Sequence, residues 1–134
     1  PALTMLGAAP AVRPRRQALL EQRREALASG DFSCVPAINY DAAKCFDERP
    51  RPLAATFVPV PAGIEELPRA SMMWVHISAA GKVTEVQRLR PSKDPPFERA
   101  ARQFARTTNC VTARKGGAAI AAWTQWQFPP APRP

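Results

Sequence analysis

The sequence has no apolar stretch that approaches the roughly 20 residues a membrane-spanning helix needs, so it predicts no membrane span in this chain. It has one histidine, His76, and three cysteines, none of which forms the C-x-x-C spacing of a zinc site. His76 has no Ser, Cys or carboxylate partner at a recognisable spacing, and no phosphate-binding loop is present. We therefore expect a protein that is not an enzyme and that carries no cofactor and no metal.

The cysteines Cys34, Cys45 and Cys110 allow more than one arrangement. A single disulfide plus one free thiol would fit an oxidising compartment, either as Cys34 with Cys45 across a short loop or as Cys45 with Cys110. Three buried free thiols in a cytosolic protein are the alternative. The spacing alone does not choose between the pairings.

Proline is abundant, at 16 of 134 residues, but is absent from residues 69–90 and 97–128. Because proline fixes φ and removes a backbone donor, regular structure should concentrate in these two windows. We expect residues 1–68 to form a leader, with a short helix at about 15–29 and a Pro-rich extended segment, which includes a candidate edge strand at 57–61. Residues 69–130 should form the folded domain and 131–134 a tail. Residues 2–11 fit the end of a signal peptide or an apolar leader.

Alternation of apolar residues predicts a strand at 71–78 and a second at 83–89. In the first, Met73, Val75 and Ile77 share one face and Met72, Trp74 and His76 the other. A tight turn at 79–82 should place Gly81 at a positive φ. The apolar members of the second strand recur at a spacing of three, which predicts a β-bulge.

Asp94 followed by Pro95 and Pro96 predicts the start of a helix. Its apolar positions recur at helical spacing and lie on one face: Phe97, Ala100, Ala101, Phe104, Ala105 and Thr108. A last strand is predicted at 119–128, with Trp123 and Trp126 on opposite faces. The order strand, strand, helix, strand predicts an α+β fold, a small three-stranded antiparallel sheet with one packed helix. The second face would be covered by the upstream chain or left for a partner.

Residues 69–130 resemble the TonB/TolA family of periplasmic C-terminal domains, and TonB more closely than TolA. The matching features are the strand and turn at 75–83, Val86, Ser92, the helix start at 97–101, and Gly117 with the closing strand that ends in Phe128. The chain departs from the family at Arg90-Pro91, at Asn109-Cys110-Val111, and ahead of the first strand, where Leu67-Pro68 stands in place of Tyr-Pro.

The resemblance implies a module of the bacterial cell envelope that works in the periplasm. Members of the family connect an inner-membrane motor to outer-membrane transporters, and they pair a transporter peptide with an exposed sheet edge. An inner-membrane anchor would have to lie upstream of this sequence. An unpaired strand edge can accept a peptide as an extra strand, and 119–128 is the candidate edge. The candidate partner-binding residues are Ile120, Ala122, Trp123, Thr124, Gln125, Trp126 and Gln127.

Two further interpretations concern the leader and the charge. The chain could instead be a structural subunit of a larger envelope assembly, with its N-terminal half wrapping neighbouring subunits. Residues 82–115 hold nine basic and three acidic side chains, which suits an anionic envelope surface, an acidic partner or a solvated face. Nucleic acid is disfavoured as a partner, because no stacking aromatics interleave with these charges.

Overall fold

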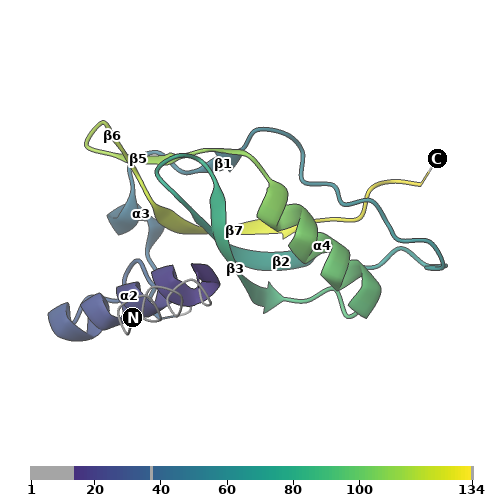
Figure 1. Ribbon diagram of the computed structural model, residues 1–134, viewed down its shortest axis with the longest axis horizontal. Coiled ribbons are helices and arrows are strands. Elements are labelled where there is room, and N and C mark those ends of the chain that lie inside the picture. The colour runs from purple at the N-terminus through teal and green to yellow at the C-terminus, as the bar shows by residue number, and fades with distance from the viewer. Residues whose placement is uncertain (1–13, 37, 134) are drawn as a thin grey trace, which may run out of the picture.

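The computed structural model describes residues 14–36 and 38–133 (Figure 1). The helices are α2 (Pro14–Ser29), α3 (Ala42–Cys45) and α4 (Pro95–Thr107). The strands are β1 (Arg51–Pro52), β2 (Ser71–Ile77), β3 (Val83–Arg90), β4 (Cys110–Val111), β5 (Ala113–Lys115), β6 (Ala118–Ile120) and β7 (Ala122–Phe128). Within these ranges no helix is both long enough and apolar enough to span a membrane.

The main sheet has three antiparallel strands in the order β3-β2-β7, and α4 packs on one of its faces (Figure 1). Val75 at the centre of β2 pairs with Val86 of β3 and with Thr124 of β7. The predicted α+β fold and its β-β-α-β order are confirmed. The β2–β3 ladder also contains the predicted bulge, as register shifts at Met72/Met73 and His76/Ile77.

The turn between β2 and β3 depends on Gly81. Its φ is 81°, as predicted, and the Gly81 carbonyl oxygen accepts a hydrogen bond of 3.0 Å from the backbone N–H of Cys110. A Cβ atom at this position would lie 2.4 Å from the Cys110 carbonyl oxygen. Glycine is therefore needed at position 81 for two reasons: the turn requires a positive φ, and the chain that follows α4 passes too close to leave room for a Cβ atom.

Helix α4 is fixed at its N-terminus by two carboxylates. Asp94 caps it, because its Oδ1 accepts a hydrogen bond of 3.0 Å from the N–H of Phe97. The buried carboxylate of Glu98 accepts hydrogen bonds of 2.9 Å from Ser71 Oγ and from the N–H of Ser92. The predicted apolar face then packs on β2, and three of its residues are fully buried, namely Phe97, Ala101 and Ala105.

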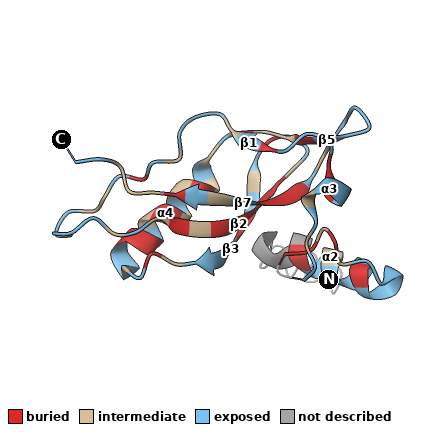
Figure 2. Ribbon diagram, turned by 180° about the vertical axis from the view of Figure 1, so that it is seen from behind, coloured by how far each residue is buried: buried red, intermediate tan, exposed pale blue. Residues whose placement is uncertain are grey.

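The second face of the sheet is covered by the upstream chain. Leu19 and Ala26 of α2 and Val35 pack against Trp74 and Trp123. Figure 2 shows that buried positions follow β2 along its length and recur on α2 and α4. Residues of the expected leader thus form a second hydrophobic core together with the sheet.

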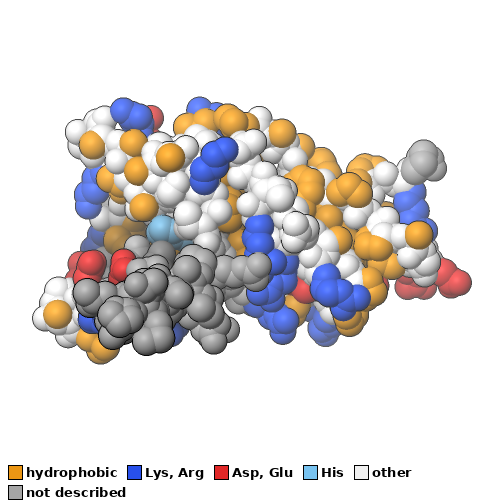
Figure 3. Space-filling model, in the orientation of Figure 1, with side chains coloured by type: hydrophobic (Ala, Val, Ile, Leu, Met, Phe, Trp, Pro, Cys, Tyr) orange, Lys and Arg blue, Asp and Glu red, His pale blue; other side chains and the backbone are white. Residues whose placement is uncertain are grey.

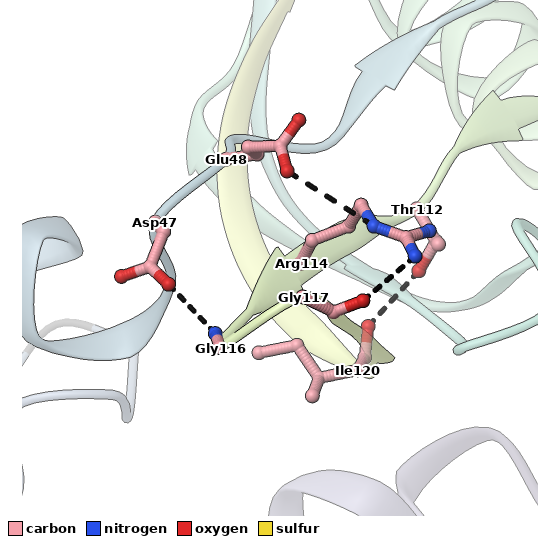
Figure 4. Close-up of polar contacts among 7 residues, drawn as sticks. All are labelled: Asp47, Glu48, Thr112, Arg114, Gly116, Gly117 and Ile120. Atoms are coloured by element: carbon pink, nitrogen blue, oxygen red, sulfur yellow. Dashed lines mark hydrogen bonds and ion pairs between the residues drawn. The ribbon is translucent and has the colours of Figure 1, made fainter.

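The last strand was predicted as one continuous run at 119–128, but the structure divides it into two strands. The chain leaves the strand conformation at Ala121, so Ile120 belongs to β6 and pairs with Ala113 of β5, while β7 starts at Ala122. Thr112 Oγ1 lies 2.9 Å from the Ile120 carbonyl oxygen and supports this bend (Figure 4). The strands β1, β4, β5 and β6 have two or three residues each, too few to produce an alternating pattern.

The β5–β6 hairpin is joined to the upstream chain by polar contacts (Figure 4). Asp47 Oδ2 accepts a hydrogen bond of 2.7 Å from the N–H of Gly116, and Glu48 forms an ion pair of 4.0 Å with Arg114. Arg114 Nη2 also donates to the Gly117 carbonyl oxygen at 2.8 Å. These contacts connect the segment after α3 to the C-terminal half of the chain.

The close approach at Gly81 yields a stability prediction. Gly81→Ala should lower the free energy of unfolding by about 2 kcal/mol or more, because the new Cβ is strained at positive φ and meets the Cys110 carbonyl. Gly63→Ala is the matched control, since Gly63 has a φ of 92° and a Cβ atom at this position would have no neighbouring atom within 4 Å. That variant should cost about 1 kcal/mol. Urea denaturation measures both, and equal losses would contradict the role given to the Cys110 contact.

Candidate functional site

The candidate site is the outer edge of β7, which is an edge strand of the sheet as predicted. Its seven candidate residues do not share one environment. Ala122, Trp123 and Thr124 are buried, Ile120 and Trp126 are half-buried, and Gln125 and Gln127 are exposed. Trp123 and Trp126 lie on opposite faces, as predicted, because Trp123 belongs to the cluster under α2 and Trp126 packs near Phe128 and α4.

The backbone of β7 shows which residues face outward. The carbonyl oxygen of Trp123 accepts a hydrogen bond of 2.5 Å from Tyr40 Oη, and that of Gln127 accepts one of 2.8 Å from Thr56 Oγ1. These carbonyls therefore point away from β2. Because alternate residues of an antiparallel strand turn both backbone polar groups to the same side, Gln125 also presents its N–H and C=O outward.

The end of this edge is occupied by the upstream chain itself. Val58 forms a parallel bridge with Pro130, in which its N–H donates to the Pro129 carbonyl oxygen and its own carbonyl oxygen accepts from Ala131, both at 2.8 Å. Val58 is also part of the core beneath α4. The stretch of β7 between the two hydroxyl contacts is short and is centred on Gln125.

Trp123 has a structural environment that sets it apart from the other candidates. Its indole is 1% exposed and packs beside Trp74, and its Nε1 donates a hydrogen bond to Gln22 of α2. Its side chain is therefore a core residue against the upstream chain. Its backbone, in contrast, remains at the edge of the sheet.

Tyr40 connects the sheet edge with the second core. Its ring meets Trp74 edge to face, with ring centroids 4.7 Å apart, while its hydroxyl donates to Trp123. Burial raises the pKa of the Tyr40 hydroxyl, so the donor keeps its proton at neutral pH. Sequence reasoning missed Tyr40 and Thr56, because they lie 83 and 71 residues from the carbonyls they contact.

Cys34 and Cys45 form the disulfide, with their Cα atoms 5.5 Å apart. The prediction of one bridge and one free thiol is confirmed, and Cys110 remains free and buried. Burial raises the pKa of the Cys110 thiol to about 11, although Lys82 acts in the opposite direction. The bridge closes the loop that carries Tyr40, so it limits the movement of this side chain relative to β7.

His76 lies on the same sheet face as Trp123, and its side chain is buried and hydrogen-bonded within the fold. It is 6% exposed, its Nδ1 lies 2.5 Å from Thr84 Oγ1, and its ring centroid lies 5.0 Å from that of Trp123. Burial lowers its pKa from 6.5 to about 4. Among residues 14–36 and 38–133, no group of three or more His, Cys, Asp or Glu side chains could hold a metal ion.

Removal of the disulfide should loosen the loop around Tyr40. Replacing both Cys34 and Cys45 with serine should lower the free energy of unfolding by about 3 kcal/mol, as expected for a bridge that closes a short loop. Urea denaturation measures this, and reduction of the native chain should give the same loss. Mass spectrometry after alkylation in denaturant should find one reactive thiol without reductant and three with it. Three reactive thiols without reductant would contradict the bridge.

The buried His76 predicts that stability falls in mild acid. Because its pKa is about 4 when folded and 6.5 when unfolded, the unfolded chain binds more protons between these values. Stability is complete above about pH 6.5, and up to about 3 kcal/mol should be lost as the pH falls toward 4. His76→Gln should show a shallower fall over the same window. Parallel profiles for the two proteins, measured by urea denaturation, would contradict this origin.

No model of a protein family matches the chain, and no curated protein matches it. The resemblance of residues 69–130 to the TonB/TolA family thus stays a prediction that depends on the residues given for it above.

Proposed function

We propose that this chain is a protein-interaction module of the bacterial cell envelope, TonB-like in its mode of binding, that takes a partner peptide as an added strand at the outer edge of β7. The observation that carries the proposal is the outward-facing backbone of Gln125 on an exposed part of an edge strand. A peptide that pairs there would gain backbone hydrogen bonds without a preformed cavity.

A longer peptide would also need the carbonyls of Trp123 and Gln127. These now accept the hydroxyls of Tyr40 and Thr56, so the peptide would replace each side-chain donor with a backbone N–H. Exchanging one hydrogen bond for another costs little net free energy. The hydroxyls therefore protect the edge from non-specific pairing but leave it accessible to a partner that matches the strand.

The disulfide supports an oxidising location such as the periplasm, since such bridges are rare in cytosolic proteins. Within this proposal the partner is an envelope protein, with a peptide of an outer-membrane transporter as the first candidate. Participation in energy transduction would further require an anchor upstream of this sequence.

The packing of the upstream chain weighs against the structural-subunit alternative. In that function the N-terminal half would wrap neighbouring subunits. Leu19 of α2 and Val58, however, pack on the two faces of the chain's own sheet. Such residues are not available to a neighbour while the domain keeps this fold.

Gln125→Pro tests the proposed edge, because proline removes the outward N–H and leaves the ladder with β2 intact. We expect the variant to stay folded, with a similar circular dichroism spectrum, and to lose at least about tenfold in affinity for the partner peptide. The probes are synthetic peptides that tile the periplasmic segments of outer-membrane transporters, with binding measured by fluorescence anisotropy.

Gln125→Ala is the matched control, since it removes the side chain and keeps the N–H. It should bind within about threefold of the native chain, because strand addition uses the backbone. Equal affinity of the native chain and the folded Gln125→Pro variant would show that the peptide binds elsewhere. An equal loss in both variants would assign the contact to the side chain instead of the strand edge.

A further inference from the structure

A groove of about 570 Å³ runs along the outer edge of β3, on the opposite side of the sheet from β7. Leu19, Leu20 and Arg23 of α2 form one wall, and Arg102 of α4 lies on the other. The two helices pack on opposite faces of the sheet, so the edge of β3, with Val86 and Arg88, forms the floor. The groove lies at the position where a fourth strand would add to the sheet, between the two helices.

The floor of the groove presents backbone hydrogen-bonding groups. The backbone N–H and C=O groups of residues 122, 124, 126 and 128 of β7 point toward β2. The β2 residues that pair with them point their own backbone groups toward β7. The backbone groups of the alternate residues Trp74 and His76 therefore point toward β3, where these two residues pair with Gln87 and Glu85. Val86 and Arg88 then direct their N–H and C=O groups away from the sheet, into the groove.

The groove is strongly basic. Arg23, Arg88 and Arg102 come from three different elements, and none of them forms an ion pair with another residue in the described part of the chain. Arg99 and Lys93 extend the charge into an adjoining hollow of about 340 Å³ that Arg88 and Arg102 also line. Figure 3 shows Lys and Arg side chains gathered over this part of α4 and β3.

The carboxylates near these arginines have structural roles. Glu98 accepts its hydrogen bonds from Ser71 and Ser92, and Asp94 caps α4. Glu85 also lines the groove, but it is 5% exposed. Among the described residues that line the groove, four arginines (Arg23, Arg88, Arg102 and Arg106) stand against one carboxylate, the buried Glu85.

We propose that this groove binds an acidic, extended segment of a partner protein, which adds as a strand to the edge of β3. The arginines select acidic side chains, and the exposed side chain of Leu20 offers an apolar contact to a side chain between them. Leu20 is 52% exposed, which is consistent with an uncovered apolar wall. A nucleic acid or another polyanion would use the arginines but leave the apolar wall and the strand edge without contacts.

Other occupants from this chain fit the groove less well. Residues 1–13 contain no acidic side chain and include Arg13, so they do not complement the arginines. A second copy of the chain carries a net charge of +8 and would be repelled. The proposal concerns the edge opposite β7 and does not depend on strand addition at Gln125.

The test uses the full chain and a synthetic peptide of alternating Glu and Val, with blocked ends, in fluorescence anisotropy. Arg88→Glu combined with Arg102→Glu should lower its affinity by about tenfold or more, because like charges would then face each other in the groove. The control, Arg49→Glu with Arg51→Glu, makes the same charge change outside the groove and should retain affinity within about threefold. Leu20→Asp, on the exposed wall, is the second groove variant and should also weaken binding if the paired arginine variant does not fold.

Amide hydrogen exchange locates the bound peptide. We expect added protection within residues 84–90, and the same protection in Gln125→Pro, which keeps the two edges distinguishable. Protection at 123–127 instead would overturn the proposal. It would also fail if both charge variants lost affinity equally, or if heparin or single-stranded DNA bound tightly and the Glu-Val peptide did not. Equal loss in both charge variants would mean that the overall positive charge of the chain attracts the peptide. Tight binding of heparin or DNA alone would mean that the groove binds polyanions.

Discussion

Both faces of the central strand β2 are apolar, and the rest of the structure follows from the need to cover them. Met73, Val75 and Ile77 lie under α4, while Trp74 lies under α2 and Tyr40. A sheet of three strands with one helix would expose the second face to water, at a cost of about 25 cal/mol for each Å² of apolar surface. The upstream chain is therefore part of the fold, despite its proline content.

The cover on the second face combines α2 with the irregular loop that follows it, and this makes the disulfide important. The loop between Cys34 and Cys45 carries Tyr40, whose ring packs on Trp74 and whose hydroxyl reaches the edge of β7. A loop without regular backbone hydrogen bonds loses much conformational entropy when it orders. A covalent bridge reduces that loss, so one crosslink supports both the second core and the protection of the sheet edge.

The sequence predicted the parts of the fold that have a long, regular pattern. The alternation at 71–78 and the 3.6-residue period with its Asp94 cap specify β2 and α4, because local spacing there reports burial directly. The break at Ala121 was not predictable, since alanines on both sides fit either face of a strand. The contacts of Tyr40 and Thr56 were also missed, because they depend on residues brought together only by the complete fold. Of the candidate site, the position of β7 at the sheet edge was predictable, whereas the burial of Trp123 under the upstream chain was not.

The two edges of the sheet differ in chemistry because different segments flank them. Neutral hydroxyls and the extended chain at Val58 lie along β7, so a peptide there would compete mainly through backbone hydrogen bonds, which depend little on salt. Arginines of α2, β3 and α4 surround the edge of β3, so binding there would include charge attraction, which 0.1 M salt screens at separations beyond about 10 Å. Since α2 and α4 wall the β3 edge, a partner strand there would also bury apolar contacts with α2. Under the two proposals, the same sheet would thus distinguish two classes of peptide without a change in its own conformation.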